Sequence, residues 1–255
     1  MVSTGIKVAD LARRERWLLL AIAAAVTALA WLALVAGHPP PGSPHELMRP
    51  HAHPSGLRGL GLAFGMWMVM MVGMMLPPVL PWILLFAASH RTRGRGGAYL
   101  PTSLFTAGYF IVWSAYSLAA AGAQLLIRPS NLLDHGGSLA APAGGTVLIV
   151  AGIFQFTPFK AACLAHCRSP LGFFLTRWRD GPVGTLGMGM RHGAYCLGCC
   201  WALMAVGFAV GVMNLVWMAA LTVFLCVEKI APGGEVAGHV FGGVLVLWGV
   251  WNLVA

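Results

Sequence analysis

The fold is organised around residues 160–201, whose sequence is KAACLAHCRSPLGFFLTRWRDGPVGTLGMGMRHGAYCLGCCW. This stretch holds five of the six cysteines of the chain, in two groups of three ligand-type residues. The groups are Cys163, His166 and Cys167, and then Cys196, Cys199 and Cys200. Residues at positions i, i+3 and i+4 share one face of a helix. The stretch therefore predicts two thiol-bearing helical faces, joined by an arm, Ser169–Gly184, that can fold one face onto the other.

Apolar sequence surrounds this stretch on both sides. Of the 255 residues, 58% are hydrophobic and only 9% are charged, whereas about a quarter of the residues of a soluble domain are charged. Several apolar runs reach the roughly 20 residues that a helix needs to cross a bilayer. The sequence therefore predicts an all-α, polytopic helical membrane protein and leaves no room for a large soluble domain.

We expect about seven membrane spans. They are Trp17–Ala36, a run that begins near Leu60, Leu100–Ile127, Gly144–Phe159, Leu186–Val210, Asn214–Ile230 and Val236–Ala255. Pro77, Pro78 and Pro81 predict a kinked or unwound end for the second span. The segment Ala161–Gly184, between the fourth and fifth spans, is too polar to cross but is amphipathic, so we expect it to lie at the membrane interface.

The first 59 residues differ in character from the rest. We expect residues 1–59 to form an anchor helix and a Pro/His-rich external loop, and residues 60–255 to form the helical membrane domain. The first apolar run is longer than the roughly 7–15 residues typical of a signal peptide, so we expect it to be retained. The loop histidines, His38, His45, His51 and His53, fit either metal capture outside the membrane or a solvated loop.

Basic residues are distributed unevenly between the two sides of this topology. With a cytoplasmic N-terminus, the outer loops hold only Arg49, Arg58 and Arg128. The inner side holds Lys7, Arg13, Arg14, Arg16, Arg91, Arg93, Arg95, Lys160, Arg168, Arg177, Arg179, Arg191 and Lys229. Positive charge gathers on the cytoplasmic side of membrane proteins. The pattern predicts a bacterial inner (cytoplasmic) membrane protein with a periplasmic C-terminus, and it explains the net charge of +9 without a nucleic-acid partner.

The clustered cysteines are candidate ligands for a soft metal ion. Thiolates favour Cu(I) and Zn²⁺, and a nearby imidazole can complete the coordination shell. The candidate metal ligands are Cys163, His166, Cys167, His192, Cys196, Cys199 and Cys200. The alternative is that these cysteines pack as small apolar residues, which we prefer for Cys226 in the sixth span. The predicted cytoplasmic side, where thiols stay reduced, favours a metal over a disulfide framework.

Methionines form two stripes on the second span. Met66, Met70 and Met74 recur every four residues, and Met68, Met71 and Met75 follow a second stripe. Thioethers are soft ligands that suit Cu(I), but methionine also fills gaps between helices. Met70, Met74 and Met75 are the candidate path for metal transfer from the external side.

Two further polar groups interrupt the apolar sequence. Gln155, Thr157 and Lys160 surround Pro158 at the end of the fourth span, where they could line the same cavity as Cys163. Glu228 and Lys229 close the sixth span, where we expect them to anchor the helix at the interface rather than to move protons or ions.

Three functional hypotheses remain open. The chain has no Walker loop, Ser-His-Asp order, paired carboxylates or dinucleotide fingerprint, which favours a role other than enzyme. The first hypothesis is binding or handling of a soft metal ion, Cu(I) first and zinc second, with a metal donor or acceptor protein as partner. The second is thiol–disulfide exchange by Cys196 and Cys199. The third is an accessory or structural subunit of a larger membrane complex.

Several motifs resemble one bacterial family over roughly Leu60–Ala255. They are MMLP at 74–77, QFTPFK at 155–160, CLAHCRSPLGF at 163–173, GAYCLGCCW at 193–201, GVMNLVWM at 211–218, and Glu228-Lys229. The family is the domain of unknown function numbered twenty-one eighty-two, whose members are described as predicted metal-binding integral membrane proteins. The resemblance implies a metal-binding membrane protein, and it implies no particular metal, substrate or reaction.

Overall fold

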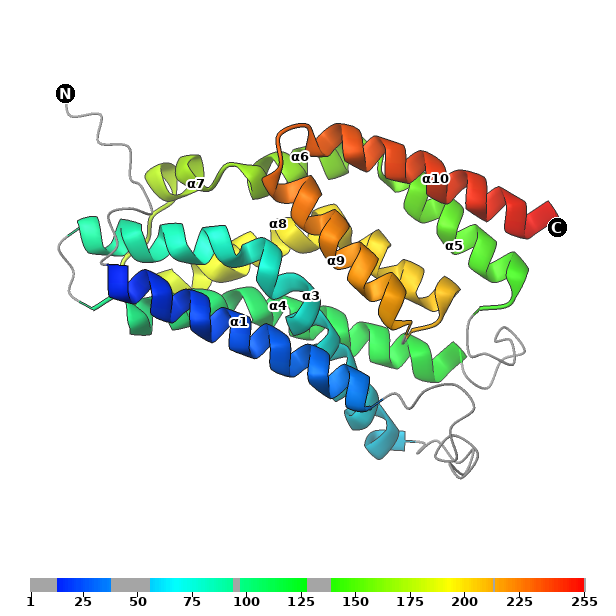
Figure 1. The fold of residues 1–255 in the computed structure, drawn as a ribbon, viewed down its shortest axis with the longest axis horizontal. Helices are drawn as coiled ribbons and strands as arrows, with labels where there is room; N and C mark the ends of the chain where they lie inside the picture. Colours follow the sequence, from blue (N-terminus) through cyan, green and yellow to red (C-terminus); the bar gives the residue numbers. More distant parts are fainter. Residues whose placement is uncertain (1–12, 38–55, 94–96, 128–138, 213, 255) are drawn as a thin grey trace.

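The structure is a computed structural model that describes residues 13–37, 56–93, 97–127, 139–212 and 214–254 (Figure 1). The expected loop histidines lie outside the described residues, as do Arg49, Arg95 and Arg128. The described chain is helical, which confirms the all-α class. Its helices are α1 (Arg13–Ala36), α3 (Gly56–Thr92), α4 (Tyr99–Ile127), α5 (Ala141–Phe154), α6 (Pro158–Arg168), α7 (Pro170–Thr176), α8 (Gly181–Val210), α9 (Leu215–Ile230) and α10 (Gly234–Val254).

Five of these helices, α1, α3, α4, α8 and α10, are long and apolar enough to cross a membrane. A sixth span is possible if α5 and α6, which meet at a bend of 63°, together form one broken crossing. Helix α9 has 16 residues, fewer than the roughly 20 of a full span. The structure therefore fits a membrane protein, and the count of seven spans stays a prediction.

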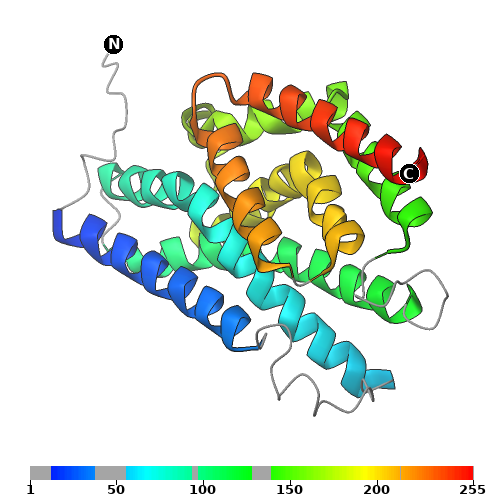
Figure 2. The same ribbon diagram turned by 45° about the vertical axis from the view of Figure 1, so that its right-hand side comes forward.

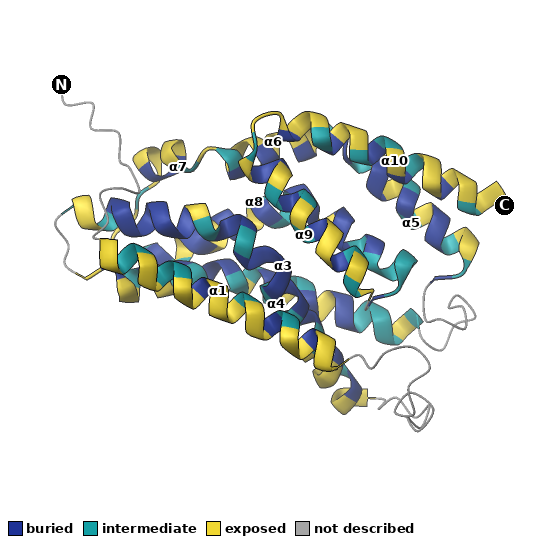
Figure 3. Cartoon of the chain, viewed as in Figure 1, coloured by how far each residue is buried: buried dark blue, intermediate teal, exposed yellow. Residues whose placement is uncertain are grey.

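The outer helices expose apolar side chains. Leu29 of α1 is 65% exposed and Leu247 of α10 is 73% exposed, and Figure 3 shows exposed outer faces along both helices. Soluble proteins rarely expose continuous apolar surfaces of this kind, because water penalises them. Lipid is the environment in which these faces are stable.

Helix α8 lies at the centre of the bundle (Figure 2) and packs against α4, α5, α6 and α9. Glycines let α8 approach α4 closely: a Cβ on Gly189 would lie 2.0 Å from the Phe105 carbonyl oxygen, and one on Gly108 would lie 2.2 Å from the Leu186 carbonyl oxygen. Such small residues bring backbones together where packing rather than the hydrophobic effect drives helix association. The close contact fixes which α4 side chains can reach the cysteines of α8.

The prolines of α3 bend the helix without unwinding it. The helix runs from Gly56 to Thr92 through Pro77, Pro78 and Pro81, and Figure 1 shows it changing direction partway along. Pro77 lacks the N–H that would bond the carbonyl of Gly73, and the Trp31 Nε1 of α1 donates to that carbonyl at 3.3 Å. Of the two predicted outcomes, a kinked or an unwound end, the structure shows the kink, since a neighbouring helix satisfies a freed backbone group.

The expected interfacial segment Ala161–Gly184 forms two short helices and a link. It contains most of α6, all of α7, and the chain that enters α8 at Gly181. Helix α7 is amphipathic: it buries Phe173 and Phe174 and exposes Leu175. Its position relative to a membrane stays a prediction.

Candidate functional site

Helices α6 and α8 bring the two cysteine groups together, as the matched spacing predicts. A Cβ on Gly198 of α8 would lie 2.8 Å from the Cys163 Sγ of α6, so the two helices touch. One turn further along, the sulfurs of Cys167 and Cys199 lie 3.9 Å apart. Cys167, Cys196, Cys199 and Cys200 are buried, and all are free thiols. The α6–α8 crossing therefore places thiols from both groups in one apolar interior.

A small cavity of about 10 Å³ opens beside these thiols, and we call it the thiol cavity. Five helices contribute to its wall. The lining residues are Pro78, Val79 and Trp82 of α3, Tyr109 of α4, Cys167 of α6, His192 and Cys196 of α8, and Lys229 of α9. This volume holds about one water-sized particle. The cavity suits a single small ion and excludes an organic substrate.

Cys196 is the most densely contacted thiol of the cavity. Its Sγ lies 3.0 Å from the Tyr109 hydroxyl and 2.9 Å from the Lys229 Nζ. The Cys199 and Cys200 thiols donate to the Cys196 carbonyl at 3.1 and 2.9 Å. Trp82 Nε1 donates to the Cys167 carbonyl at 2.8 Å, which fixes the end of α6 against α3. Hydrogen bonds from three helices thus hold the sulfurs in place.

The two buried lysines near the site have different partners. Lys160 pairs with the Glu228 carboxylate and the Gln155 side-chain carbonyl. Lys229 instead contacts Cys196 and, at 3.8 Å, the sulfur of Cys200. A buried ammonium is costly without a counter-charge, and no carboxylate of the described chain forms an ion pair with Lys229. A thiolate within the cysteine cluster would supply that charge, and the thiolate is the form that binds metals.

His192 presents an unsatisfied nitrogen in this wall. Its ring is buried and stacks on Trp82 with centroids 3.7 Å apart. Its Nδ1 has no hydrogen-bond partner among the described residues. Buried polar atoms without a partner are rare in native proteins and call for an explanation such as an ion. An imidazole nitrogen beside thiols is a suitable soft-metal ligand.

The geometry fits a pair of thiolates better than a complete zinc cage. Bonds of about 2.3 Å, the length of a zinc–thiolate bond, would connect the Cys167 and Cys199 sulfurs through one ion at an angle of about 116°. Structural Zn²⁺ requires four ligands. Among the described residues, no three His, Cys, Asp or Glu side chains are already arranged to hold one ion. An ion held between the Cys167 and Cys199 sulfurs therefore gains a third ligand only if another side chain rotates toward it. Cys196 and His192 are the neighbours able to do so.

Some candidate ligands lie away from the thiol cavity. His166 is exposed and stacks on Tyr195 with centroids 4.4 Å apart, and its Nδ1 lies 2.9 Å from the Ala162 carbonyl oxygen. Cys163 is half-buried against Gly198. Cys199 and Cys200 are buried but do not line the cavity, and Cys200 lies next to Lys229. The spacing predicted which residues share a helix face. The way in which α6 and α8 cross decides which of these residues reach the thiol cavity.

The candidate transfer methionines, Met70, Met74 and Met75, belong to α3 and are all buried in the core. Met74 lies four residues before Pro78, and Met75 lies four residues before Val79. Residues four apart share a helix face, and Pro78 and Val79 line the thiol cavity. The two methionine stripes of α3 therefore lead along the helix to the cavity.

The polar residues around Pro158 lie beside the cavity rather than in its wall. Gln155 and Lys160 are buried in the cluster with Glu228. The Thr157 hydroxyl accepts from the Lys160 backbone N–H at 3.3 Å and caps α6. A Cβ on Gly238 of α10 would lie 2.5 Å from the Glu228 Oε1, so α10 covers this ion pair. The cluster holds α6 against α9 and α10.

Three residues of the site were not predicted as functional. Tyr109 and Trp82 carry no sequence signal that separates them from other core aromatics. Lys229 does carry such a signal, because a charged residue within an apolar run often marks a functional position. The expectation that Glu228 and Lys229 anchor the helix at an interface is wrong: they are 0% and 9% exposed, and each contacts a partner in the core.

Comparison with models of protein families identifies the family of this chain. A family model, PpoB2, described as a copper chaperone, matches residues 64–252. No curated protein and no solved structure matches the chain. The match confirms that this is a metal-related family, with copper as the metal its description names.

Proposed function

The chain belongs to the PpoB2 family of copper chaperones, and from this premise we propose that it binds Cu(I) as cargo inside the membrane and passes it to a partner protein. The observation that carries the proposal is the pair of sulfurs, Cys167 and Cys199, 3.9 Å apart across two helices beside a cavity of single-ion size. Soft thiolates select Cu(I).

The charges of the cavity support a monovalent cargo. With Cys167 and Cys199 as thiolates and Cys196 as a neutral thiol, the pair and one Cu(I) carry a net charge of −1, and the Lys229 ammonium in the cavity wall makes the group neutral. Neutral groups avoid most of the penalty for burying charge in an apolar interior. With Zn²⁺, the same ligands and Lys229 would leave a net positive charge, so zinc is the second choice.

The surroundings suggest how the ion enters and leaves. Met70, Met74 and Met75 form the proposed entry path, because the methionine stripes of α3 lead to Pro78 and Val79. His166 and Cys163, which lie on α6 away from the thiol cavity, are the proposed exit ligands toward an acceptor protein. His192 and Cys196 would exchange with the Cys167–Cys199 pair as the ion moves.

Several finer predictions belong to this proposal. We place the thiol sites toward the cytoplasmic side of a bacterial inner membrane, on the strength of the uneven distribution of basic residues. We also place the functional domain in residues 60–255 and identify the family with that of the predicted metal-binding integral membrane proteins.

Anaerobic Cu(I) titration against a chromophoric chelator tests the proposal. We expect one tightly bound Cu(I) per chain with sulfur neighbours in X-ray absorption spectra. The Cys167→Ser/Cys199→Ser variant should lose this binding, whereas Cys226→Ser, which changes a half-buried cysteine outside the site, should retain it. Equal Cu(I) affinity in all three proteins would reject the proposal.

The same sulfur pair favours thiol–disulfide exchange as a second candidate. The two sulfurs face each other, although a disulfide requires them to approach to about 2.05 Å. The exchanging pair would then be Cys167 and Cys199, rather than the Cys196 and Cys199 of the sequence hypothesis. Thiol trapping followed by mass spectrometry decides: a Cys167–Cys199 disulfide that forms and is reduced during turnover supports exchange, and permanently reduced thiols exclude it.

A further inference from the structure

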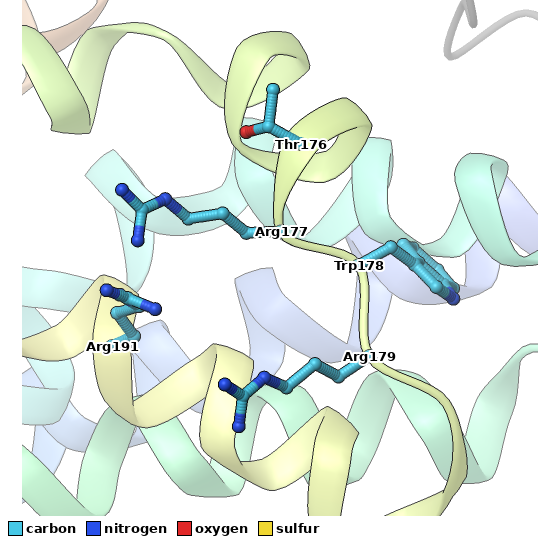
Figure 4. A pocket seen from close by; sticks show the side chains of 5 residues that line it. All are labelled: Thr176, Arg177, Trp178, Arg179 and Arg191. Atoms are coloured by element: carbon cyan, nitrogen blue, oxygen red, sulfur yellow. The ribbon is translucent and has the colours of Figure 1, made fainter.

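Three arginines gather at one surface pocket, away from the thiol cavity. The pocket has a volume of about 590 Å³ and is lined by Thr176, Arg177, Trp178, Arg179 and Arg191; we call it the arginine pocket. Arg177 and Arg179 come from the link between α7 and α8, and Arg191 comes from α8 itself. Figure 4 shows these arginine side chains extending to the same side of the link, whereas Trp178 points the other way.

The described part of the chain supplies no carboxylate that neutralises the arginine charges. All three side chains are exposed, and no carboxylate of the described chain forms an ion pair with them. The nearby Asp180 accepts a hydrogen bond of 2.7 Å from Trp178 Nε1. Three like charges that line one pocket repel one another. A bound anion would offset this repulsion.

The link that carries the arginines is held firmly in place. Trp178 stacks on Phe86 of α3 with centroids 5.4 Å apart, and the Arg93 guanidinium lies 4.0 Å from the centre of the Trp178 ring. Phe174, one turn earlier, is fully buried. The positions of Arg177 and Arg179 are therefore constrained by aromatic packing of the link against α3, as a binding site requires.

We propose that Arg177, Arg179 and Arg191 bind a phosphate group, and that this phosphate belongs to the headgroup of an anionic phospholipid. Guanidinium groups match phosphate oxygens in geometry and charge. The volume of about 590 Å³ lies in the usual range of ligand sites and exceeds the size of a bare phosphate. Leu171 and Leu175 of α7, 42% and 64% exposed, lie beside the arginines and offer an apolar surface for acyl chains.

The test is native mass spectrometry of the full-length protein, released from nanodiscs that contain phosphatidylglycerol and phosphatidylcholine in equal amounts. The wild type should retain phosphatidylglycerol in preference to phosphatidylcholine. The Arg177→Gln/Arg179→Gln/Arg191→Gln variant should bind phosphatidylglycerol on the order of 100-fold more weakly, at about 1 kcal/mol for each arginine near a lipid surface.

The matched control is Arg13→Gln/Arg14→Gln/Arg16→Gln. It removes three charges from the start of α1, at the same end of the bundle as α7 in Figure 1. This variant should retain lipid to within a few-fold of the wild type. Equal losses in both triple variants would mean general surface charge, and no loss in either would mean no site; both results overturn the proposal.

A second arm uses inorganic phosphate as the probe, measured by its ability to displace retained phosphatidylglycerol from the wild type. Weak displacement supports a lipid headgroup. Arginine-dependent binding of inorganic phosphate without any preference for phosphatidylglycerol over phosphatidylcholine overturns the lipid source and assigns the pocket to a soluble phosphate. Helical content and Cu(I) binding should match the wild type in both triple variants, because all the changed residues lie outside the thiol cavity.

Discussion

Lys229 determines the charge of the thiol cavity at the scale of single residues. Its Nζ contacts the Cys196 sulfur at 2.9 Å, and the Tyr109 hydroxyl contacts the same sulfur at 3.0 Å. One contact is charged and the other is neutral, although their lengths are nearly equal. The pair therefore offers a way to separate charge balance from simple hydrogen bonding in copper binding.

We expect Lys229→Met to weaken Cu(I) binding by about 10–100-fold, the usual cost of removing a group that supports a metal ligand. The reason is that a buried complex of Cu(I) with two thiolates then lacks its counter-charge. Tyr109→Phe, the control, removes a neutral hydrogen bond worth about 1 kcal/mol, which is roughly fivefold in affinity. Competition titration with a Cu(I) chelator measures both variants, and equal effects would argue against the charge-balance role.

At this scale the sequence predicted the ligand types better than their partners. The cysteine spacing correctly predicted that Cys167 and Cys199 lie on facing surfaces of two helices. It could not predict that His166 turns outward onto Tyr195 while His192 lies in the core against Trp82. Both histidines follow the same spacing rule, and only the contacts of the folded bundle distinguish them.

At the scale of elements, the contact between α4 and α8 positions the site. Gly189 allows the two backbones to touch, since a Cβ there would lie 2.0 Å from the Phe105 carbonyl oxygen. Tyr109 stands one turn after Phe105 on α4, and Cys196 stands two turns after Gly189 on α8. Separating the helices at the glycine therefore moves the hydroxyl away from the sulfur.

Gly189→Ala should lower the stability of the protein by about 1–3 kcal/mol, as overpacking of a close interface does. Gly187→Ala is the matched control on the same helix, because nothing lies within 4 Å of its Cβ, and it should leave stability unchanged or slightly raised. Thermal unfolding in detergent compares the two. A Tm for Gly189→Ala no lower than that of Gly187→Ala would contradict the close contact.

Helices α5 and α6 show a limit of what the hydrophobic pattern of the sequence can predict. The apolar run predicted as the fourth span, Gly144–Phe159, becomes α5 and the first residues of α6, with a bend of 63° between the helices. Pro158 marked the break correctly, but the direction that α6 takes depends on Lys160 meeting Glu228 in the core. That contact joins residues 68 positions apart, beyond the reach of any local pattern.

At the scale of the whole molecule, the two ends of the helical bundle have different compositions. The start of α1, α7 and the arginine pocket lie at one end, and the end of α10 lies at the other (Figure 1). The positive-inside rule predicts that the first end lies in the cytoplasm. On that prediction the chain crosses the membrane an odd number of times, as five or seven spans would and six would not.

Fusion reporters test this topology. A fluorescent protein at the N-terminus should be fluorescent in cells, because it folds in the cytoplasm. Alkaline phosphatase joined after Ala255 should be active, because it requires the oxidising periplasm. Inactive phosphatase combined with a fluorescent C-terminal fusion would show an even number of crossings and reverse the assignment of every later loop.

The ion pair between Lys160 and Glu228 also governs the order of assembly during synthesis. Lys160 is made 68 residues before its partner, a delay of roughly 3–14 seconds at about 5–20 residues per second. During this interval α6 carries a cation without its counter-charge and cannot settle into its apolar position. Lys229, the last member of the cavity wall, follows Glu228 directly. On the proposed function, the wall of the thiol cavity is complete only after Lys229 of α9 has been synthesised, so we expect copper to be loaded after that point.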